Sequence, residues 1–180
     1  MLRWWNKKCR TGKKIINLGC EKIAISSAIF NRAEIINEIS KLIGRQSIVV
    51  VLDIKKSFLG GHEIYTHNGT KKVKKSLDAL LEEINDYGVG ELVINSIDRD
   101  GTRKGFDINL MEKIYTRVSS PLTILGGANS EKCIIDAVSR FNLIGAAAGS
   151  MFVFKGTYDA VLISYISDET RKKIKTMGSS

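Results

Sequence analysis

Two aspartates lie close together directly after an apolar segment, at residues 91–97, of the kind that forms a buried strand. They are Asp98 and Asp100, separated by one arginine and followed by Gly101. Proteins built on parallel strands place reactive groups at the carboxyl ends of the strands, because the loops there can vary while the strands stay packed. On an extended backbone the two carboxylates share a face. We therefore expect one to contact a substrate and the other to hold the loop through the amides of Gly101 and Thr102.

Asp53 ends the most apolar segment of the chain, residues 48–52, where a carboxylate is unexpected. A carboxyl group at the end of a buried strand suits general acid–base catalysis, because it is partly removed from water yet still accessible to a substrate. The alternative is a structural contact with Lys55, Lys56 or a loop amide. The sequence favours neither interpretation over the other.

Pairs of small residues follow three apolar segments: Ser26–Ser27, Gly126–Gly127 and Gly149–Ser150. Glycines expose backbone amides, and a helix that begins after them adds a positive dipole end, so the two later pairs are typical of a phosphate-binding loop. The serine pair offers a weaker anion site. The alternative for the glycines is a structural one, in which two tight turns pack a helix onto the sheet.

Apolar segments alternate with segments of helical periodicity along the chain. The expected strands cover 23–25, 48–52, 91–97, 122–125 and 144–148, and the expected helices cover 33–43, 76–87 and the stretches capped by Asp107 and Ser130. Strands separated by helices are connected in parallel, and uninterrupted apolar strands are typical of a sheet covered on both faces. The sequence therefore predicts an α/β fold.

A hairpin is expected after the strand that ends at Asp53. The alternating segment 62–66 is followed by Asn68–Gly69, a strong signal for a tight hairpin turn. His62 and His67 fall within it, and we expect both to be exposed. No third ligand lies at a suitable spacing, so no metal site is predicted.

The composition bounds the class of protein. The 180 residues, 43% of them apolar and 26% charged, predict one globular domain. The net charge of +9 is concentrated in basic runs at 7–14, 71–75 and 171–175, which lack the aromatic residues and the motifs of nucleic-acid binding, so we expect solvated faces and a loose tail. The sequence shows neither a signal peptide nor a membrane span, which favours a cytoplasmic protein, and its three cysteines indicate reduced thiols.

Motifs in a fixed order resemble one known family. They read VLDIK at 51–55, IDRDGT at 97–102, GFD at 105–107, GGA at 126–128 and AGSMF at 148–152. Over residues 12–166 the chain resembles the cyclase subunit of imidazole glycerol phosphate synthase, and the segments 65–69 and 149–156 are similar to second-copy paralogues from surface-polysaccharide gene clusters. Residues 1–11 are unmatched, and 167–180 form a basic C-terminal tail.

The resemblance implies a (β/α)₈ TIM barrel of which this chain holds about the last five βα units. It implies a reaction in which ammonia from a glutaminase subunit, the partner in a heterodimer, closes the imidazole ring on a doubly phosphorylated ribotide, without cofactor or metal. By resemblance Asp53 is one of two catalytic aspartates, and Lys22 and Glu91 lie at the ammonia entrance. The phosphate- and substrate-binding residues that it implies are Ser26, Ser27, Asn95, Ser96, Asp98, Asp100, Gly101, Gly126, Gly127, Gly149 and Ser150.

The chain departs from the family because a complete barrel takes about 250 residues. The earlier strands and the other aspartate are missing from the sequence, so we expect an N-terminally truncated member without cyclase turnover on its own, and with strand 23–25 as an exposed edge. Two alternatives stay open. The chain could supply ammonia for the amidation of a sugar in polysaccharide biosynthesis, or bind a phosphorylated metabolite without catalysis.

Overall fold

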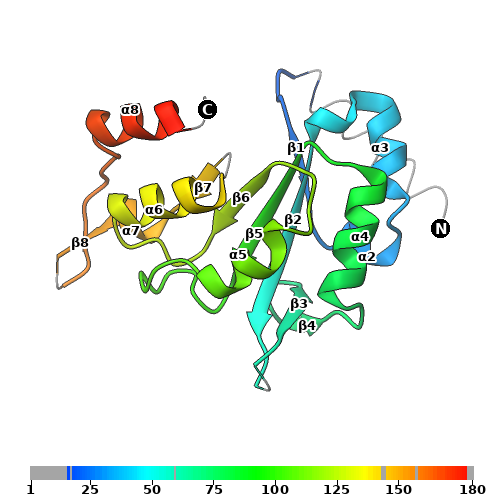
Figure 1. Ribbon diagram of the computed structural model, residues 1–180, viewed down its shortest axis with the longest axis horizontal. Coiled ribbons are helices and arrows are strands. Elements are labelled where there is room, and N and C mark those ends of the chain that lie inside the picture. Colours follow the sequence, from blue (N-terminus) through cyan, green and yellow to red (C-terminus); the bar gives the residue numbers. More distant parts are fainter. Residues whose placement is uncertain (1–15, 17, 59, 143–144, 157, 178–180) are drawn as a thin grey trace.

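The computed structural model describes residues 16, 18–58, 60–142, 145–156 and 158–177. The basic run at 7–14 and the unmatched segment 1–11 lie outside these residues. The described chain contains one large sheet flanked by helices, together with a small separate hairpin (Figure 1).

Parallel strands form the body of the sheet. They are β1 (Ile23–Ile25), β2 (Ile48–Lys56), β5 (Glu91–Ser96), β6 (Leu122–Leu125) and β7 (Gly145–Ala147), and they lie in this spatial order. All the expected strands are therefore present, and their carboxyl ends meet along one rim. In the part of the chain that the structure describes, β1 and β7 each pair along one side only, so the sheet is not closed.

β2 extends past Asp53 and pairs with an antiparallel hairpin. β3 (His62–Thr66) pairs with the last residues of β2, from Asp53 to Lys56, and β4 (Lys71–Lys72) pairs with β3. The turn between β3 and β4 has Asn68 and Gly69 in the left-handed region, with φ of 56° and 78°. The expected hairpin is confirmed, and it adds antiparallel strands to the sheet beside the carboxyl end of β2.

The helices follow the strands as the periodicity predicted. They are α2 (Ala28–Asn31), α3 (Ile35–Ile43), α4 (Leu77–Tyr87), α5 (Ile108–Tyr115), α6 (Glu131–Phe141), α7 (Ser150–Val153) and α8 (Asp168–Met177), with the 3₁₀ turn η1 at Arg45–Ser47. Asp107 accepts a hydrogen bond from the amide of Leu110, and Ser130 accepts one from the amide of Cys133, so both predicted N-caps are confirmed. Ser76 caps α4 in the same way.

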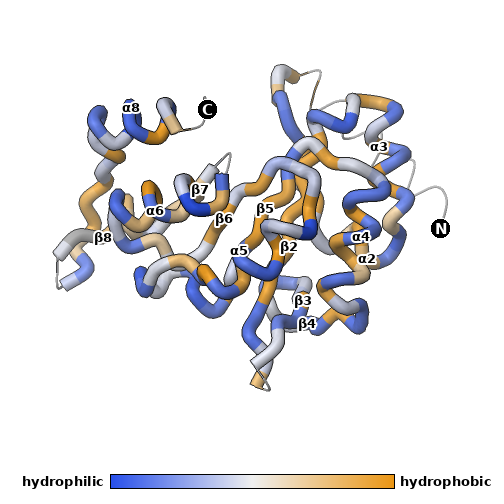
Figure 2. The backbone as a smooth tube through the Cα atoms, in the orientation of Figure 1, coloured by the Kyte–Doolittle hydropathy of each residue, from blue (hydrophilic) through white to orange (hydrophobic). Residues whose placement is uncertain are grey.

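The helices cover one face of the sheet. Along β2, Ile48, Val50, Leu52 and Ile54 are fully buried in the core, whereas Val51 and Asp53, which point the other way, are half-buried. β5 repeats this alternation, and both strands run through the apolar centre of the molecule (Figure 2). The expectation of a sheet covered on both faces holds only in part, because on the second face Val49 and Thr123 are buried but Asp53 and Asn95 are half-buried.

The segment expected to be a loose basic tail instead forms α8, which docks on α6 (Figure 1). Glu131, at the start of α6, accepts hydrogen bonds from the backbone and hydroxyl of Ser167 and from the hydroxyl of Thr170. Hydrogen bonds from Thr170 and Ser167 lower the pKa of Glu131. The basic residues of α8 are thus the solvent-facing side of an anchored helix. Among the described residues, no helix has the length and apolarity needed to span a membrane.

Candidate active site

Asp53 and Asn95 form the centre of the candidate site. They are register partners on the parallel strands β2 and β5, and they project from the half-buried face of the sheet. Asn95 donates a hydrogen bond from Nδ2 to Oδ1 of Asp53 over 2.8 Å. The Oδ1 atom of Asn95 is buried without a hydrogen-bond partner in the described structure. The amide therefore fixes the orientation of the carboxylate and leaves one unused acceptor beside it.

The two lysines considered as partners of Asp53 contact Asp98 instead. The backbone amide of Lys56 donates to Oδ2 of Asp98 over 2.6 Å, and Nζ of Lys55 lies 4.0 Å from Oδ1 of Asp98. The contact that Asp53 makes is with a side-chain amide from the neighbouring strand. A structural contact and a role in acid–base catalysis are therefore compatible for Asp53. The amide of Asn95 holds it, and it still lies at the carboxyl end of its strand.

The sequence predicts that one of Asp98 and Asp100 holds the loop and that the other contacts a ligand, and the structure places them differently. Asp98 holds the loop, as expected of one of them, but it does so through the backbone of β2 and not through the amides of Gly101 and Thr102. The amide of Thr102 donates to the carbonyl of Arg99. Asp100 lines the hollow described below, so it is the carboxylate of this pair that can meet a ligand.

Ser96 lies away from the site. Side chains alternate along a strand, so Ser96 falls on the helix-covered face with Leu92 and Ile94, where it is only 4% exposed. Its carbonyl accepts hydrogen bonds from the amides of Arg99 and Asp100 and so forms the turn after β5. Of the two residues expected to face a substrate from this strand, only Asn95 shares a face with Asp53.

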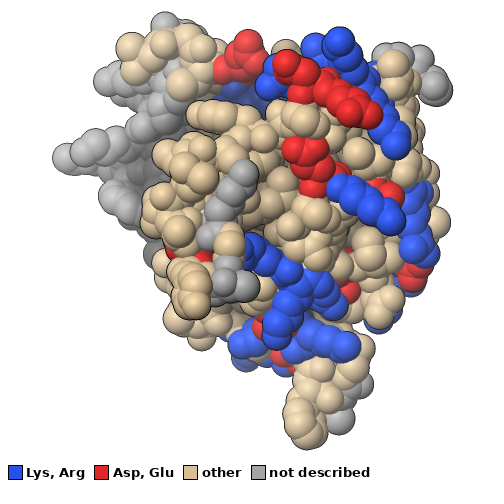
Figure 3. All heavy atoms as spheres, turned by 90° about the vertical axis from the view of Figure 1, so that its left-hand side faces the viewer, with Lys and Arg blue, Asp and Glu red and all other residues tan. Residues whose placement is uncertain are grey.

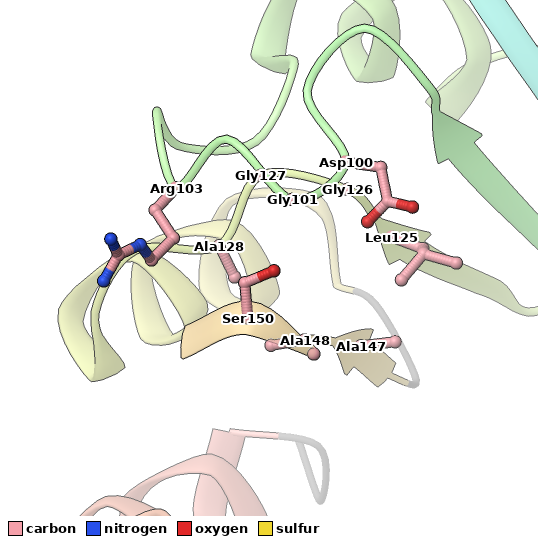
Figure 4. Close-up of a pocket in the computed structure, with 11 residues that line it drawn as sticks. Asp100, Gly101, Arg103, Leu125, Gly126, Gly127, Ala128, Ala147, Ala148 and Ser150 are labelled. Atoms are coloured by element: carbon pink, nitrogen blue, oxygen red, sulfur yellow. The ribbon is translucent and has the colours of Figure 1, made fainter. Parts of the chain in front are cut away.

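A shallow hollow with an enclosed space of about 10 Å³ lies at the carboxyl ends of β6 and β7 (Figure 4). Its lining comes from the loop after β5, the loop after β6 and the start of α7: Asp100, Gly101, Arg103, Leu125, Gly126, Gly127, Ala128, Ala147, Ala148, Gly149 and Ser150. This enclosed space is about what one water molecule needs, so a larger group would lie at the open mouth of the hollow. In Figure 4 the hydroxyl of Ser150 points toward the loop that carries Gly101.

Gly126 and Gly127 are required for packing as well as for any ligand. Both have positive φ, of 97° and 99°. A Cβ on Gly126 would lie 2.5 Å from the carbonyl oxygen of Ser96, and one on Gly127 would lie 2.3 Å from that of Gly105. The pair therefore has a packing role against the loop after β5, while phosphate binding stays a prediction. Gly149 differs, because an added Cβ would meet nothing within 4 Å.

Arg99 and Gly105 are residues of the site that the sequence did not single out for a role. The guanidinium of Arg99 donates to the carbonyls of Lys104 and Gly105, over 3.3 and 3.2 Å, and the amide of Gly105 donates to the carbonyl of Gly127 over 2.7 Å. The Arg99 bonds hold the loop after β5 together, and the Gly105–Gly127 bond ties this loop to the loop after β6. Only the fold brings them together, since nothing in the local pattern pairs Gly105 with Gly127.

Ser26 and Ser27 lie at the same rim but near the opposite edge of the sheet. They follow β1, which pairs with β2 and not with β6 or β7. Ser26 is half-buried and Ser27 is exposed at the start of α2, without a side-chain capping bond. Asp53 and Asn95, on the two strands between, separate this serine pair from the hollow, so a ligand with two anionic ends would reach across them.

Lys22 and Glu91 meet at the other end of the sheet. Nζ of Lys22 lies 2.6 Å from Oε2 of Glu91, and Thr123 donates to Oε1 of the same carboxylate over 2.7 Å. Burial raises the pKa of Glu91, but the hydrogen bonds from Lys22 and Thr123 and the charge of Lys22 outweigh it, so the pKa lies below its usual value. The two residues that resemblance grouped together are in direct contact, at the end of the sheet opposite Asp53.

His62 is not the exposed hairpin residue that the sequence predicted. Its side chain is only 5% exposed, with Nδ1 3.5 Å from Nζ of Lys113 and Nε2 3.9 Å from Oδ2 of Asp107. Burial and the charge of Lys113 lower the pKa of His62, and Asp107 opposes them only in part. His67 is exposed, as expected. Among the described residues, no group of three His, Cys, Asp or Glu side chains is placed to hold a metal ion.

An incomplete parallel α/β barrel, with polar groups at the carboxyl rim and an ion pair at the opposite end, is the class of protein that this fold and site define. A family model described as "Histidine biosynthesis protein" matches residues 7–159. The chain belongs to this family, and within it to the cyclase type named for the HisF subunit of imidazole glycerol phosphate synthase.

Three curated relatives, all provisionally named as imidazole glycerol phosphate synthase subunits, illustrate the similarity. The Vibrio vulnificus hisF3 protein is 44% identical over 93% of this chain and 65% of its own length. The Leptospira borgpetersenii HisF protein is 43% identical over 84% of this chain and 60% of its own length, and the Pseudomonas aeruginosa hisF2 protein is 42% identical over 88% and 63%. The chain thus spans somewhat less than two thirds of the length of these relatives.

Proposed function

We propose that this chain carries the Asp53 side of an ammonia-dependent cyclase site of the imidazole glycerol phosphate synthase type. The observation that supports this most is the arrangement around Asp53. A carboxylate oriented by Asn95 lies on the rim between the serine pair and the glycine-lined hollow. A substrate with a phosphate at each end would place its central part, where the ring closes, beside Asp53.

In this proposal Asp53 transfers protons as ammonia adds to the substrate and the imidazole ring closes. A positioned carboxyl group typically contributes about 10²–10⁴-fold to such a step. Asn95 keeps the reacting oxygen in place through its 2.8 Å hydrogen bond. The amides near Gly126, Gly127 and Gly149 bind one phosphate, and Ser26 and Ser27 bind the other. Asp100, at the edge of the hollow, orders the polar part of the ligand.

The ammonia would come from a glutaminase subunit bound at the amino-terminal end of the parallel strands. Lys22 and Glu91 mark the entrance there, and their ion pair supports this part of the proposal. Family members named as synthase subunits work in a complex, so a partner chain is expected. A cytoplasmic location and the absence of a cofactor stay predictions.

Binding of the doubly phosphorylated ribotide tests the proposal, measured by isothermal titration calorimetry on the wild-type chain and on two variants. Gly149→Val fills the hollow without meeting any neighbour at Cβ, and Asp53→Asn keeps the shape of the site. We expect saturable binding by the wild type, a loss of about tenfold or more for Gly149→Val, and binding within about threefold of wild type for Asp53→Asn. No saturable binding by a folded wild-type chain would overturn the proposal.

Turnover separates the cyclase from an ammonia-supplying role. Turnover is measured as the ammonium-dependent release of the product ribotide. We expect Asp53→Asn to lower its rate by about 10²–10⁴-fold. Lys22→Met should leave turnover with added ammonium salts unchanged, because ammonia then does not need the entrance. If Asp53→Asn had no effect on turnover, the role in ammonia supply would be favoured instead.

A further inference from the structure

Arg103 lies at the edge of the hollow and forms an ion pair with Asp159, a residue 56 positions away in the sequence. Arg103 belongs to the loop after β5. Asp159 belongs to the turn of the hairpin formed by β8 (Phe154–Lys155) and β9 (Ala160–Val161). The side chains are 31% and 58% exposed. The pair therefore joins a loop of the candidate site to a hairpin that no other part of the proposed mechanism uses.

The charges around the hollow give this pair its importance. Among the lining residues, Asp100 and Arg103 are the charged ones. With Arg103 neutralised by Asp159, the carboxylate of Asp100 dominates the hollow, and a doubly charged phosphate would meet repulsion from it. Backbone amides can bind an anion, but they carry only partial charges. Arg103 is the lining residue whose charge can offset that of Asp100 for a phosphate dianion, and it is already paired.

The pair can be exchanged at little cost. Ion pairs between solvent-exposed side chains contribute little to stability. Arg103 and Asp159 both have positive φ, of 54° and 50°, a conformation that non-glycine residues rarely adopt, so both lie in turns and not in regular elements. In Figure 4 the guanidinium of Arg103 points away from Gly126 and Gly127. On the face that carries the hairpin, basic side chains adjoin acidic ones, as Figure 3 shows.

We propose that Arg103 is the residue that selects phosphate at this hollow, and that Asp159 holds it away from the hollow until a phosphate dianion replaces the carboxylate. This rests on the proposed phosphate site. The unliganded hollow therefore binds monoanions and neutral groups weakly. Only a dianion offers Arg103 a stronger partner than Asp159. The exchange also couples the hairpin to ligand binding, since Asp159 loses its contact when the phosphate arrives.

The alternative is an ordinary surface ion pair without a role in binding. The protein offers a matched control in Arg140, which pairs with Glu112 on the surface and does not line the hollow. A change of charge at Arg140 alters the net charge of the chain as much as a change at Arg103 does. Comparing the two separates a local contact with phosphate from a general electrostatic effect.

The test is a titration of the full chain with inorganic phosphate at constant ionic strength, followed by amide chemical shifts, for the wild type, Arg103→Gln, Asp159→Asn and Arg140→Gln. We expect Arg103→Gln to weaken binding by about tenfold or more, as for loss of a charged hydrogen bond. Asp159→Asn should tighten binding by about two- to fivefold, the factor that corresponds to an exposed ion pair. Arg140→Gln should bind as the wild type does.

The outcomes separate the two proposals. Wild-type binding that Arg103→Gln leaves unchanged would overturn the role of Arg103 while the phosphate site stands. Binding that Asp159→Asn leaves unchanged or weakens would overturn the exchange, because Asp159 would then be neutral or would position Arg103 for the ligand. A wild-type chain that shows no saturable shifts overturns the phosphate site and the exchange together. Thermal unfolding curves that coincide with the wild type establish that each variant is folded.

Discussion

Nδ2 of Asn95 lies 2.8 Å from Oδ1 of Asp53, across the parallel pair β2–β5. The contact joins two residues 42 positions apart, each at the point where its strand approaches the rim. It leaves Oδ1 of Asn95 buried and without a partner among the described residues. The pair therefore combines an oriented carboxylate with an acceptor that has no partner among the described residues.

Replacing Asn95 should loosen Asp53 and cost stability. Asn95→Ala removes one partly buried hydrogen bond to a carboxylate, so we expect the free energy of unfolding to fall by about 1–2 kcal/mol. Urea denaturation at neutral pH measures this. Ser76→Ala provides a comparison, because it removes a capping bond of similar size and does not line the hollow. If ligand binding fell equally in both variants, a local role for Asn95 would be contradicted.

We expect Gly127 and Gly149 to differ in how much stability is lost on replacement by alanine. Gly127→Ala places a Cβ 2.3 Å from a backbone oxygen and at a φ of 99°, so we expect a loss of stability of about 1–3 kcal/mol. Gly149→Ala meets nothing within 4 Å, and its stability should stay within about 0.5 kcal/mol of wild type. Thermal unfolding of the two variants checks this, and equal stability would contradict the close approach of the loops at Gly127.

The Lys22–Glu91 pair predicts a pH dependence of stability. The pKa of Glu91 is lowered from its usual 4.5 in the folded chain, so the unfolded chain takes up the proton first as the pH falls. The stabilisation is therefore present above about pH 4.5 and is lost as the pH falls through the folded pKa. We expect the difference in urea midpoint between wild type and Glu91→Gln to be largest near neutral pH and to narrow on acidification.

A control identifies the source of that effect. Glu112 forms an exposed ion pair with Arg140, and its side chain is 47% exposed, against 15% for Glu91. We expect Glu112→Gln to change the urea midpoint little, both at neutral and at acid pH. A difference for Glu91→Gln that grew toward acid pH would contradict the lowered pKa.

Within the described part of the chain one side of β1 has no partner strand, which predicts association. An edge strand presents unpaired backbone groups to other molecules, and a charged side chain on such a strand opposes pairing. Ala24 is the exposed residue at the centre of β1, so Ala24→Lys disturbs the edge without entering the core. We expect the wild-type chain to be oligomeric in light scattering and Ala24→Lys to shift it toward the monomer. A monodisperse wild-type monomer would show that the edge is covered.

Local patterns in the sequence were sufficient to predict the helices, the strands and the residues at the carboxyl ends of the strands. The strands of the sheet, the N-caps Asp107 and Ser130 and the turn at Asn68–Gly69 depend on interactions within a few residues, so periodicity and turn chemistry predict them directly. Parallel connection then places Asp53, Asp100 and the glycine pairs at one edge. The resemblance to the cyclase family placed Lys22 and Glu91 together at the ammonia entrance; the structure shows the two in contact, and the entrance stays a prediction.

Only the tertiary structure decided which side chains meet. The register of β2 against β5 gives Asp53 its partner, and the same alternation turns Ser96 into the core. The helix face opposite β3 buries His62, and Glu131 anchors a segment that looks like a loose basic tail. Arg103 and Asp159 meet because two loops from distant strands share one rim. These contacts depend on long-range geometry, and no local pattern in the sequence encodes the distance between two loops.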